Sequence, residues 1–321
     1  MGSITKNKQT DENLVKMVKK AFGEKVQIIS WEELTDGLCN VAYRIYLSNG
    51  IHTILKISPD HMVKLMACEN ELMQTEVKAM KLAKEKNLVP VAEVYYYDNS
   101  RTICTGEYFF MEIIEGSSLY QLEPKLSSEE LSSFREQIGQ VLRKLNQEKG
   151  TMFGHFCVES LQFPTWYEAF SFMLTGVCRD GNLAGVDYGM ESLDILEALH
   201  KYKRCFDEVT EPAFIHYDSW NGNIFVKDNH ITGLIDWERA MWADPLMEVK
   251  FNTHELNKDF LKGYGIRSLS TSQKIRCLWY DVYLYLIMMN EVTYRQYDND
   301  DQYHWVKNLF QQSWNNLSKM G

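Results

Sequence analysis

Residues 214–238, FIHYDSWNGNIFVKDNHITGLIDWE, set several polar groups inside an apolar frame. His216, Asp218 and Asn223 share one short polar loop, and Asp236 follows a second apolar stretch. Between these two polar sites, the order of residue types predicts a strand, a turn at Asp-Asn-His and another strand. Antiparallel pairing brings the start of the first strand beside the end of the second. Any fold of this chain therefore has to accommodate a hairpin in which Asn223 and Asp236 are neighbours.

The residue types of this hairpin suit phosphate chemistry. Asn223 and Asp236 offer oxygen donors of the kind that hold Mg²⁺ together with water and substrate phosphates. Asp218 precedes Asn223 by five positions, so we expect its carboxylate to accept a proton from a hydroxyl that attacks a metal-bound phosphate. We group His216 with Asp218 in the catalytic loop and expect it inside the fold, holding the loop by hydrogen bonds. The alternative is a polar loop whose side chains only cap a turn.

The rest of the chain divides into a strand-rich part and a helical part. The pattern first predicts a helix, NLVKMVKKAFG, and then two strands in AYRIYLSNGIHTILKIS around a turn at residues 48–50. Next come a predicted helix over residues 70–85 and two further strands in AEVYYYDNSRTICTGEYFFMEII. From about residue 126 the helical period dominates, and strand patterns return only around 214–235. We therefore predict an α+β protein with a β-rich lobe, a mainly helical lobe and a ligand cleft between them.

Composition excludes several classes of protein. The net charge of −10 and the pI near 5.4 argue against binding along a nucleic-acid backbone. The seven scattered cysteines form no CxxC pair, which indicates free thiols in a cytosolic protein. The polar N-terminus lacks the apolar core of a signal peptide. The longest apolar run, residues 277–289, is too short to span a bilayer and contains Asp281. We expect a cytoplasmic protein without membrane or nucleic-acid partners, and we interpret the run as a buried helix.

Two motifs carry a family resemblance. HYDSWNGNIF, followed by GLIDWERAMWADP, resembles the aminoglycoside phosphotransferase-like family, small-molecule kinases that share the protein-kinase fold. This resemblance, which covers about residues 20–270, implies that Asp218 is the catalytic aspartate and that Asn223 and Asp236 are the magnesium ligands. Asp-Trp-Glu stands where protein kinases have Asp-Phe-Gly. Asp244 follows Asp236 by only eight positions, which leaves no room for a long activation segment, so a protein kinase is disfavoured.

The resemblance requires a positive charge for the nucleotide phosphates, and Lys56 is the lysine inside an apolar strand. Leu55 and Ile57 flank it, so Lys56 faces the other side of the sheet from both. A strand lysine that faces solvent is the alternative. A buried lysine needs a carboxylate, and Glu76 lies on the apolar face of the predicted helix 70–85. We predict a Lys56–Glu76 ion pair. Two other acidic residues near the start of this helix are expected to be solvated: Glu69 and Glu71.

Further nucleotide contacts follow from the resemblance. LTDGLCNVAYR resembles the phosphate-covering loop of the family, with Gly37 allowing close approach of the backbone and Asn40 at a polar position. YFFMEIIEGSSL resembles the hinge between the lobes. The resemblance implies that Met111 lines the adenine pocket and that the Glu112 carbonyl and the Ile114 amide bond to the base.

This hinge divides the chain into an N-terminal nucleotide-binding lobe, residues 1–113, and a C-terminal catalytic and substrate-binding lobe, residues 114–321. Two positions of the second lobe depart from the family pattern. Asn146 stands in the usual Leu-His position, and Glu248 stands where an Asp is frequent. Neither departure touches the residues assigned to the chemistry.

The implied activity is transfer of the γ-phosphate of ATP or GTP to a hydroxyl of a small polar acceptor. Aminoglycosides and other antibiotics, sugars and amino alcohols are acceptors of this kind, so antibiotic resistance is one implied role. The alternative is a pseudokinase, a nucleotide-binding module that regulates a partner without transferring phosphate. Loss of one of four residue types would indicate a pseudokinase, and all four are present: Lys56, Asp218, Asn223 and Asp236.

A cationic acceptor would need acidic side chains around the catalytic aspartate. The candidates are Glu238, the YDNDD segment at residues 297–301, and Asp180 or Asp187 in CRDGNLAGVDYG, which we interpret as a loop. The alternative is that these acidic residues are ordinary solvated charges. Trp166 is expected in the core.

Overall fold

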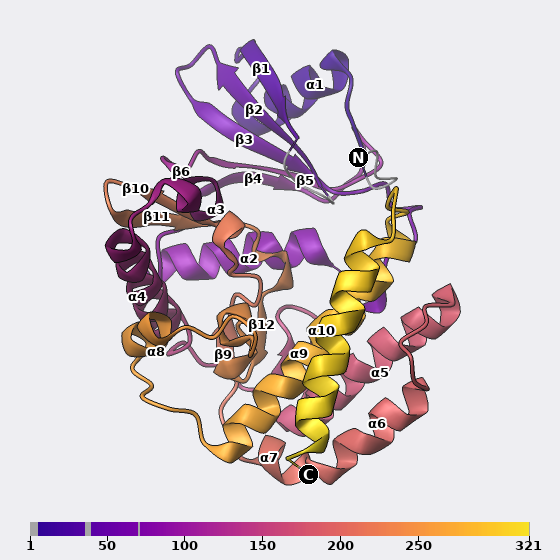
Figure 1. The fold of residues 1–321 in the computed structure, drawn as a ribbon. Helices are drawn as coiled ribbons and strands as arrows, with labels where there is room; N and C mark the ends of the chain where they lie inside the picture. Colours follow the sequence, from indigo (N-terminus) through magenta and orange to yellow (C-terminus); the bar gives the residue numbers. More distant parts are fainter. Residues whose placement is uncertain (1–5, 36–39, 70, 321) are drawn as a thin grey trace.

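The first part of the chain is built around a five-stranded antiparallel sheet with the strand order β1-β2-β3-β5-β4 (Figure 1). The computed structural model describes residues 6–35, 40–69 and 71–320. Helix α1 covers one face of the sheet, and helix α2 lies against the other. The elements of this part are α1 Asp11–Phe22, β1 Ile28–Leu34, β2 Val41–Leu47, β3 His52–Ile57, η1 Ala67–Glu69, α2 Leu72–Glu85, β4 Val94–Asp98 and β5 Tyr108–Glu112.

Alternation along β3 separates two apolar clusters. Leu55 and Ile57 belong to the cluster that α1 closes, whereas Ile54 belongs to the cluster that contains α2. Because successive side chains of a strand point to opposite faces, Lys56 shares the α2 face with Ile54. The strand pattern thus turns one lysine away from solvent and toward the second part of the molecule.

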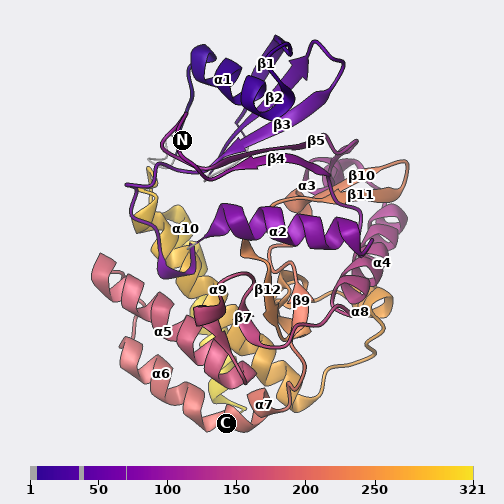
Figure 2. The same cartoon turned by 180° about the vertical axis from the view of Figure 1, so that it is seen from behind.

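The second part of the chain is mainly helical and holds two small sheets (Figure 2). One sheet has the order β11-β10-β6, and the other has the order β8-β7-β12-β9. The helices are α3 Leu119–Leu122, α4 Ser128–Leu145, α5 Trp166–Ala184, α6 Ser192–Lys201, α7 Lys203–Asp207, α8 Lys258–Tyr264, α9 Thr271–Tyr294 and α10 Asp301–Ser318. The strands are β6 Ser117–Ser118, β7 Phe153–His155, β8 Gln162–Phe163, β9 Ala213–Ile215, β10 Ile224–Lys227, β11 His230–Leu234 and β12 Met241–Ala243.

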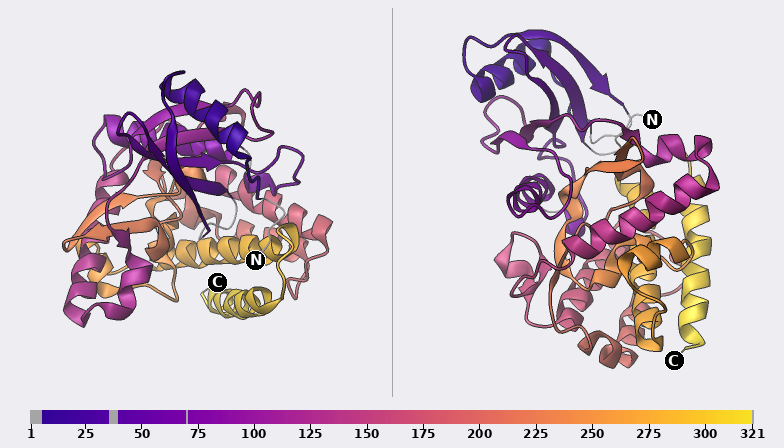
Figure 3. Two further views of the ribbon diagram at one scale, coloured as in Figure 1. Left: turned by 90° about the horizontal axis from the view of Figure 1, so that it is seen from above. Right: turned by 90° about the vertical axis from the view of Figure 1, so that its left-hand side faces the viewer.

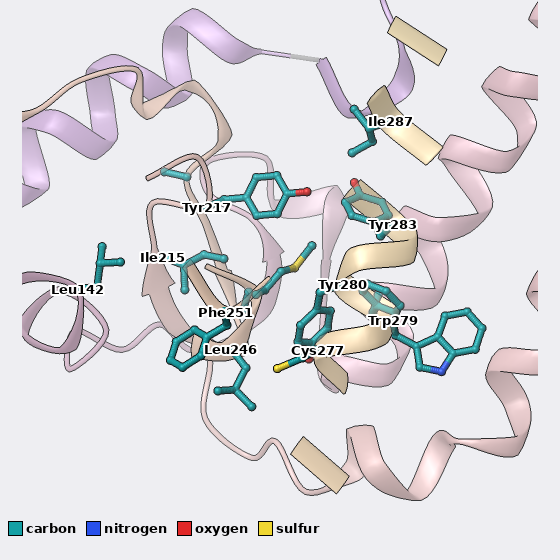
Figure 4. Packing of buried hydrophobic residues seen from close by; sticks show 14 of the residues in the cluster. Leu142, Ile215, Tyr217, Leu246, Phe251, Cys277, Trp279, Tyr280, Tyr283 and Ile287 are labelled. Carbon is teal, nitrogen blue, oxygen red and sulfur yellow. The ribbon is translucent and has the colours of Figure 1, made fainter. Parts of the chain in front are cut away.

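Helix α9 forms the centre of the helical part. It packs against α5, and α10 runs along it (Figure 3). Tyr283 of α9 and Tyr217 point toward each other (Figure 4), and their ring centroids are 6.5 Å apart. The apolar run 277–289 lies inside this helix and is largely buried, so its interpretation as a buried helix is confirmed. In the part of the chain that the structure describes, no helix is long and apolar enough to cross a membrane.

The predicted α+β class, with a β-rich and a helical part, is confirmed. Strand β1 was not predicted, because it is an edge strand whose central side chains are exposed and lack an apolar alternation. The loop predicted around Asp180 is wrong, because α5 continues to Ala184. Gly181 weakens the helical pattern there, yet a side chain at this position would meet the Tyr188 hydroxyl at 1.6 Å.

The cysteines among the described residues are all free thiols.

Candidate active site

The hairpin brings the two polar loops together as predicted. Strands β10 and β11 pair antiparallel, and the Ile235 amide donates to the Asn223 carbonyl at 3.0 Å. The turn consists of Asp228 and Asn229, whose φ angles of 50° and 61° are left-handed. Asp and Asn tolerate this region better than other residues with a side chain. Asn223 and Asp236 therefore lie at the same end of the hairpin.

Asp218 is held by Asn223. The Asn223 amide nitrogen donates to the backbone carbonyl of Asp218 at 2.9 Å and to its Oδ2 at 3.0 Å. Burial raises the pKa of Asp218 to about 7, Arg239 acts in the opposite direction, and Asp236 adds to the rise. A carboxylate with a pKa near neutrality is suited to accept a proton in general base catalysis.

Lys56 joins the sheet to the hairpin. Its Nζ lies 2.7 Å and 2.8 Å from the two carboxylate oxygens of Glu76 and 2.6 Å from Asp236 Oδ1. Burial lowers the pKa of Lys56, but the attraction of Asp236 and Glu76 outweighs it, so the net shift is upward. The lysine is therefore ionised and shared by two carboxylates, one on α2 and one at the end of the β10–β11 hairpin.

His216 lies inside the fold, as expected. Its Nε2–H donates to the Ile235 carbonyl at 3.0 Å, and the ring is fully buried 4.5 Å from the Trp237 ring. Burial lowers the pKa of His216 to about 4, so the ring is neutral at physiological pH. This histidine ties the Asp218 loop to the residue that precedes Asp236.

Glu248 was expected to touch none of the residues assigned to the chemistry, and this expectation was wrong, because it bonds to His216. Its two oxygens accept hydrogen bonds from the backbone amides of His216 and Tyr217, both at 2.9 Å, and from the Ser219 hydroxyl at 3.2 Å. Asn146 donates to the same carboxylate at 3.2 Å. Tyr217 has a left-handed φ of 69°, an unfavourable conformation that these hydrogen bonds hold in place. The two departures from the family pattern, Asn146 and Glu248, are thus partners under the Asp218 loop.

The other residues assigned to the nucleotide site lie around the same junction. Asn40 donates to Glu238 Oε2 at 2.9 Å, whereas Gly37 lies outside the described residues. Met111 is buried in β5 on the α2 face. Ile114 packs on Gly233 of β11, where a Cβ atom would meet its Cδ1 at 2.4 Å.

Glu112 ends β5 between the sheet and the second part. Its amide donates to the Glu93 carbonyl at 2.8 Å, and its carboxylate accepts from the Glu93 amide at 3.0 Å. Lys84 lies 3.4 Å from the same carboxylate. These contacts fix the strand end at the predicted hinge.

The donor set at the end of the hairpin fits Mg²⁺. Asp218 engages the amide nitrogen of Asn223, so the amide oxygen is left for a cation. Lys56 engages Oδ1 of Asp236, so Oδ2 is left as well. Among the described residues, no group of three or more His, Cys, Asp or Glu side chains could hold a metal. A magnesium ion here would complete its coordination with water and phosphate oxygens, as is usual for this ion.

Three of the acidic candidates for an amine subsite, Glu238, Asp180 and Asp187, are already engaged, whereas the aspartates of the 297–301 segment are exposed. Asp180 is buried and accepts from the Ala67 amide, and exposed Asp187 lies 2.7 Å from Lys307 Nζ. Glu69, expected to be solvated, is also buried, and it lies 2.9 Å from Arg295. The prediction for Glu69 was wrong because its partner is distant in the sequence.

Sequence and structure comparisons identify the family and the fold. The profile of the phosphotransferase enzyme family matches residues 30–251, about two thirds of the chain. No curated protein sequence matches the chain at a significant level.

Several solved structures share the fold along nearly the whole chain. A protein assigned as a fructosamine-3-kinase from Thermobifida fusca is 16% identical with a TM-score of 0.68, over 94% of this chain and 98% of that one. Aminoglycoside phosphotransferase APH(4)-Ia with ADP and hygromycin B is 17% identical with a TM-score of 0.65, over 94% and 97%. The streptomycin-ATP complex of APH(2″)-IIa is 14% identical with a TM-score of 0.62, over 97% of both chains. The family match over most of the chain shows that this protein belongs to the phosphotransferase enzyme family.

Proposed function

We propose that this phosphotransferase is a small-molecule kinase that transfers the γ-phosphate of ATP or GTP to a hydroxyl group of a small polar acceptor. One observation carries the proposal. The hairpin gathers Asp218, Asn223 and Asp236 at one end, and Lys56 from the sheet reaches the same point. A base, two oxygen ligands and a cation are the parts that phosphoryl transfer requires.

Each of these residues has a role in the proposed reaction. Asp218 accepts the proton of the attacking hydroxyl, and its pKa near 7 supports that role. Asn223 and Asp236 would hold Mg²⁺, which when bound neutralises charge on the phosphate oxygens. Lys56 places a further positive charge beside the phosphates, and Glu76 fixes its position. His216 holds the Asp218 loop through Ile235.

The remaining assignments concern the nucleotide base and the division of labour between the lobes. In our proposal, Met111 lines the adenine pocket, and the Glu112 carbonyl and the Ile114 amide bond to the base. Gly37 and Asn40 belong to the loop over the phosphates. Residues 1–113 form the nucleotide-binding lobe, and residues 114–321 form the catalytic and substrate-binding lobe.

The fold relatives support a class of acceptor. Two of the structures named above hold aminoglycosides and one is assigned as a fructosamine-3-kinase, which supports a small hydroxyl-bearing acceptor for this chain. An antibiotic, a sugar or an amino alcohol fits this description.

The test is Asp218→Asn, assayed for ADP or GDP formation with Mg²⁺ and a panel of aminoglycosides, sugars and amino alcohols. We expect a loss of at least about a hundredfold, because the amide cannot accept the proton. Asp228→Asn is the control, since this exposed turn residue lies on the same hairpin and Asn keeps its left-handed φ. Undiminished turnover in Asp218→Asn would refute the assigned base. Thermal stabilisation of the parent by MgATP, without turnover on any acceptor, would favour the pseudokinase.

A further inference from the structure

A row of buried ion pairs joins the C-terminal end of α9 to both parts of the molecule. Arg295 Nη2 lies 2.9 Å from Glu69 Oε1 and 3.0 Å from Glu291 Oε1. Glu291 Oε1 is in turn 2.8 Å from Arg239 Nη2. The four side chains are between 3% and 14% exposed, so solvent screens them little, and each charge depends on its neighbours in the row.

One end of this row holds the connection between β3 and α2. Glu69 lies in η1 of this connection, next to Ala67, whose amide donates to Asp180 of α5. The connection is thus tied to the helical part at two points. Helix α2 begins three residues after Glu69 and carries Glu76, the partner of Lys56. The position of this helix therefore depends on the anchored connection.

The other end of the row reaches the catalytic loop. Arg239 lies in η5 Trp237–Arg239, which directly follows Asp236. Helix α2 packs against η5. The charge of Arg239 also acts to lower the pKa of the Asp218 carboxyl, the assigned base. Glu291 holds this guanidinium in place.

We propose that Arg295 is a positioning residue for phosphoryl transfer. It neutralises Glu69 and Glu291 together, and it thereby fixes α2 from one side and Arg239 from the other. Without it, the buried Glu69 carboxylate would lose this partner and lie close to that of Glu291, which would keep its contact with Arg239. Repulsion between the two carboxylates would then release the β3–α2 connection. Arg295 and Glu291 lie beyond residue 251, where the family match ends, whereas Glu69 lies within the matched range. The inference rests on the proposed kinase function.

The test is Arg295→Gln in the full chain, compared with Arg276→Gln. Arg276 lies at the other end of α9, is equally buried, and also pairs with two carboxylates, Asp244 at 2.7 Å and Glu208 at 3.1 Å. We expect similar losses of stability in both variants. Only Arg295→Gln should lower the kcat for ADP formation from MgATP, by at least about tenfold, with a smaller change in KM. Arg295→Lys should recover most of the loss, because it keeps the charge.

Amide hydrogen exchange gives a second readout that does not depend on turnover. Arg295→Gln should speed exchange both at residues 58–69 and at residues 235–240, and Arg276→Gln should do neither. Faster exchange at 58–69 alone would overturn the coupling, as would equal kcat values in the two variants. If the parent itself forms no ADP, the proposed function fails, and the exchange pattern alone then decides whether Arg295 couples the two segments.

Discussion

Lys56 is one ammonium group that serves two carboxylates, Glu76 and Asp236. The three side chains together carry a net negative charge. Glu238 is a further acidic residue whose charge acts on Lys56. Nucleotide phosphates that enter this site meet further negative charge, which opposes binding unless a divalent cation accompanies them. The residues of the site thus give a physical reason for the Mg²⁺ requirement of the proposed reaction.

Lys56→Met tests the weight of this shared charge. Glu76 is 1% exposed, so loss of its cation leaves a buried carboxylate without a partner. We expect the free energy of unfolding to fall by about 3 kcal/mol and phosphate transfer to fall by at least about a hundredfold. Adding Glu76→Gln should restore part of the stability and none of the activity. Urea unfolding and ADP formation measure the two effects, and an unchanged urea midpoint in Lys56→Met would contradict the shared-charge explanation.

At the scale of secondary-structure elements, local patterns were sufficient where the partners are close in sequence. The turn at Asp228 and Asn229 and the alternation around Lys56 predicted the hairpin and the inward lysine, and both are present. The ion pairs of Glu69 could not be predicted, since Arg295 lies 226 positions away. The sequence singled out Glu248 as a departure from the family pattern but not its role, because a buried acid that accepts backbone hydrogen bonds has no signature in its own neighbourhood.

Helices α4 and α8 support the loop that carries Asp218, and they approach each other through a contact that only glycine permits. A Cβ on Gly263 of α8 would lie 1.9 Å from the Glu136 carbonyl oxygen of α4. Asn146 follows α4 and donates to Glu248, and the Tyr264 hydroxyl of α8 donates to Asn146 at 2.7 Å. The spacing of the two helices therefore sets the position of the carboxylate under the Asp218 loop.

Gly263→Ala should force these helices apart, because the atoms that the new Cβ would meet belong to the Glu136 backbone, which cannot rotate away. We expect a loss of about 2 kcal/mol in the free energy of unfolding, together with reduced turnover at temperatures where the protein is still folded. Gly176→Ala in α5 is the matched control, since the nearest atom to its Cβ is 3.6 Å away. That variant should be neutral or more stable, as Ala favours a helix over Gly. Equal thermal unfolding of the two variants would argue against a tight α4–α8 contact.

Across the whole molecule, burial shifts several titrating groups in ways that set the pH dependence of stability. It raises the pKa of Asp218, Glu248 and Asp281 to about 7 each. A carboxyl group with a raised pKa adds stability below its unfolded pKa near 4, and that stability is lost as pH rises through 7. His216 opposes this trend. Its pKa is lowered to about 4, so below about pH 6.5 the unfolded chain binds a proton that the folded protein does not, and stability falls as pH falls toward 4. Three carboxyl groups outweigh one imidazole, so stability should fall as pH rises toward 7.

Asp281 offers the cleanest test, because it lies on α9 and bonds to Thr253 rather than to the catalytic loop. Asn at this position can still accept from the Thr253 amide but cannot ionise. Between about pH 5 and 8, the free energy of unfolding of the parent should therefore fall by about 2 kcal/mol more than that of Asp281→Asn.

Asp98→Asn is the control of opposite sign. Burial raises the pKa of Asp98, but hydrogen bonds from Lys20, Ser100 and Tyr108 outweigh burial and hold it at about 2. Its contribution is lost only in acid, so this variant should be less stable by a constant amount across the same range. Parallel curves for the parent and Asp281→Asn would mean that the Asp281 carboxyl is ionised throughout, despite its burial.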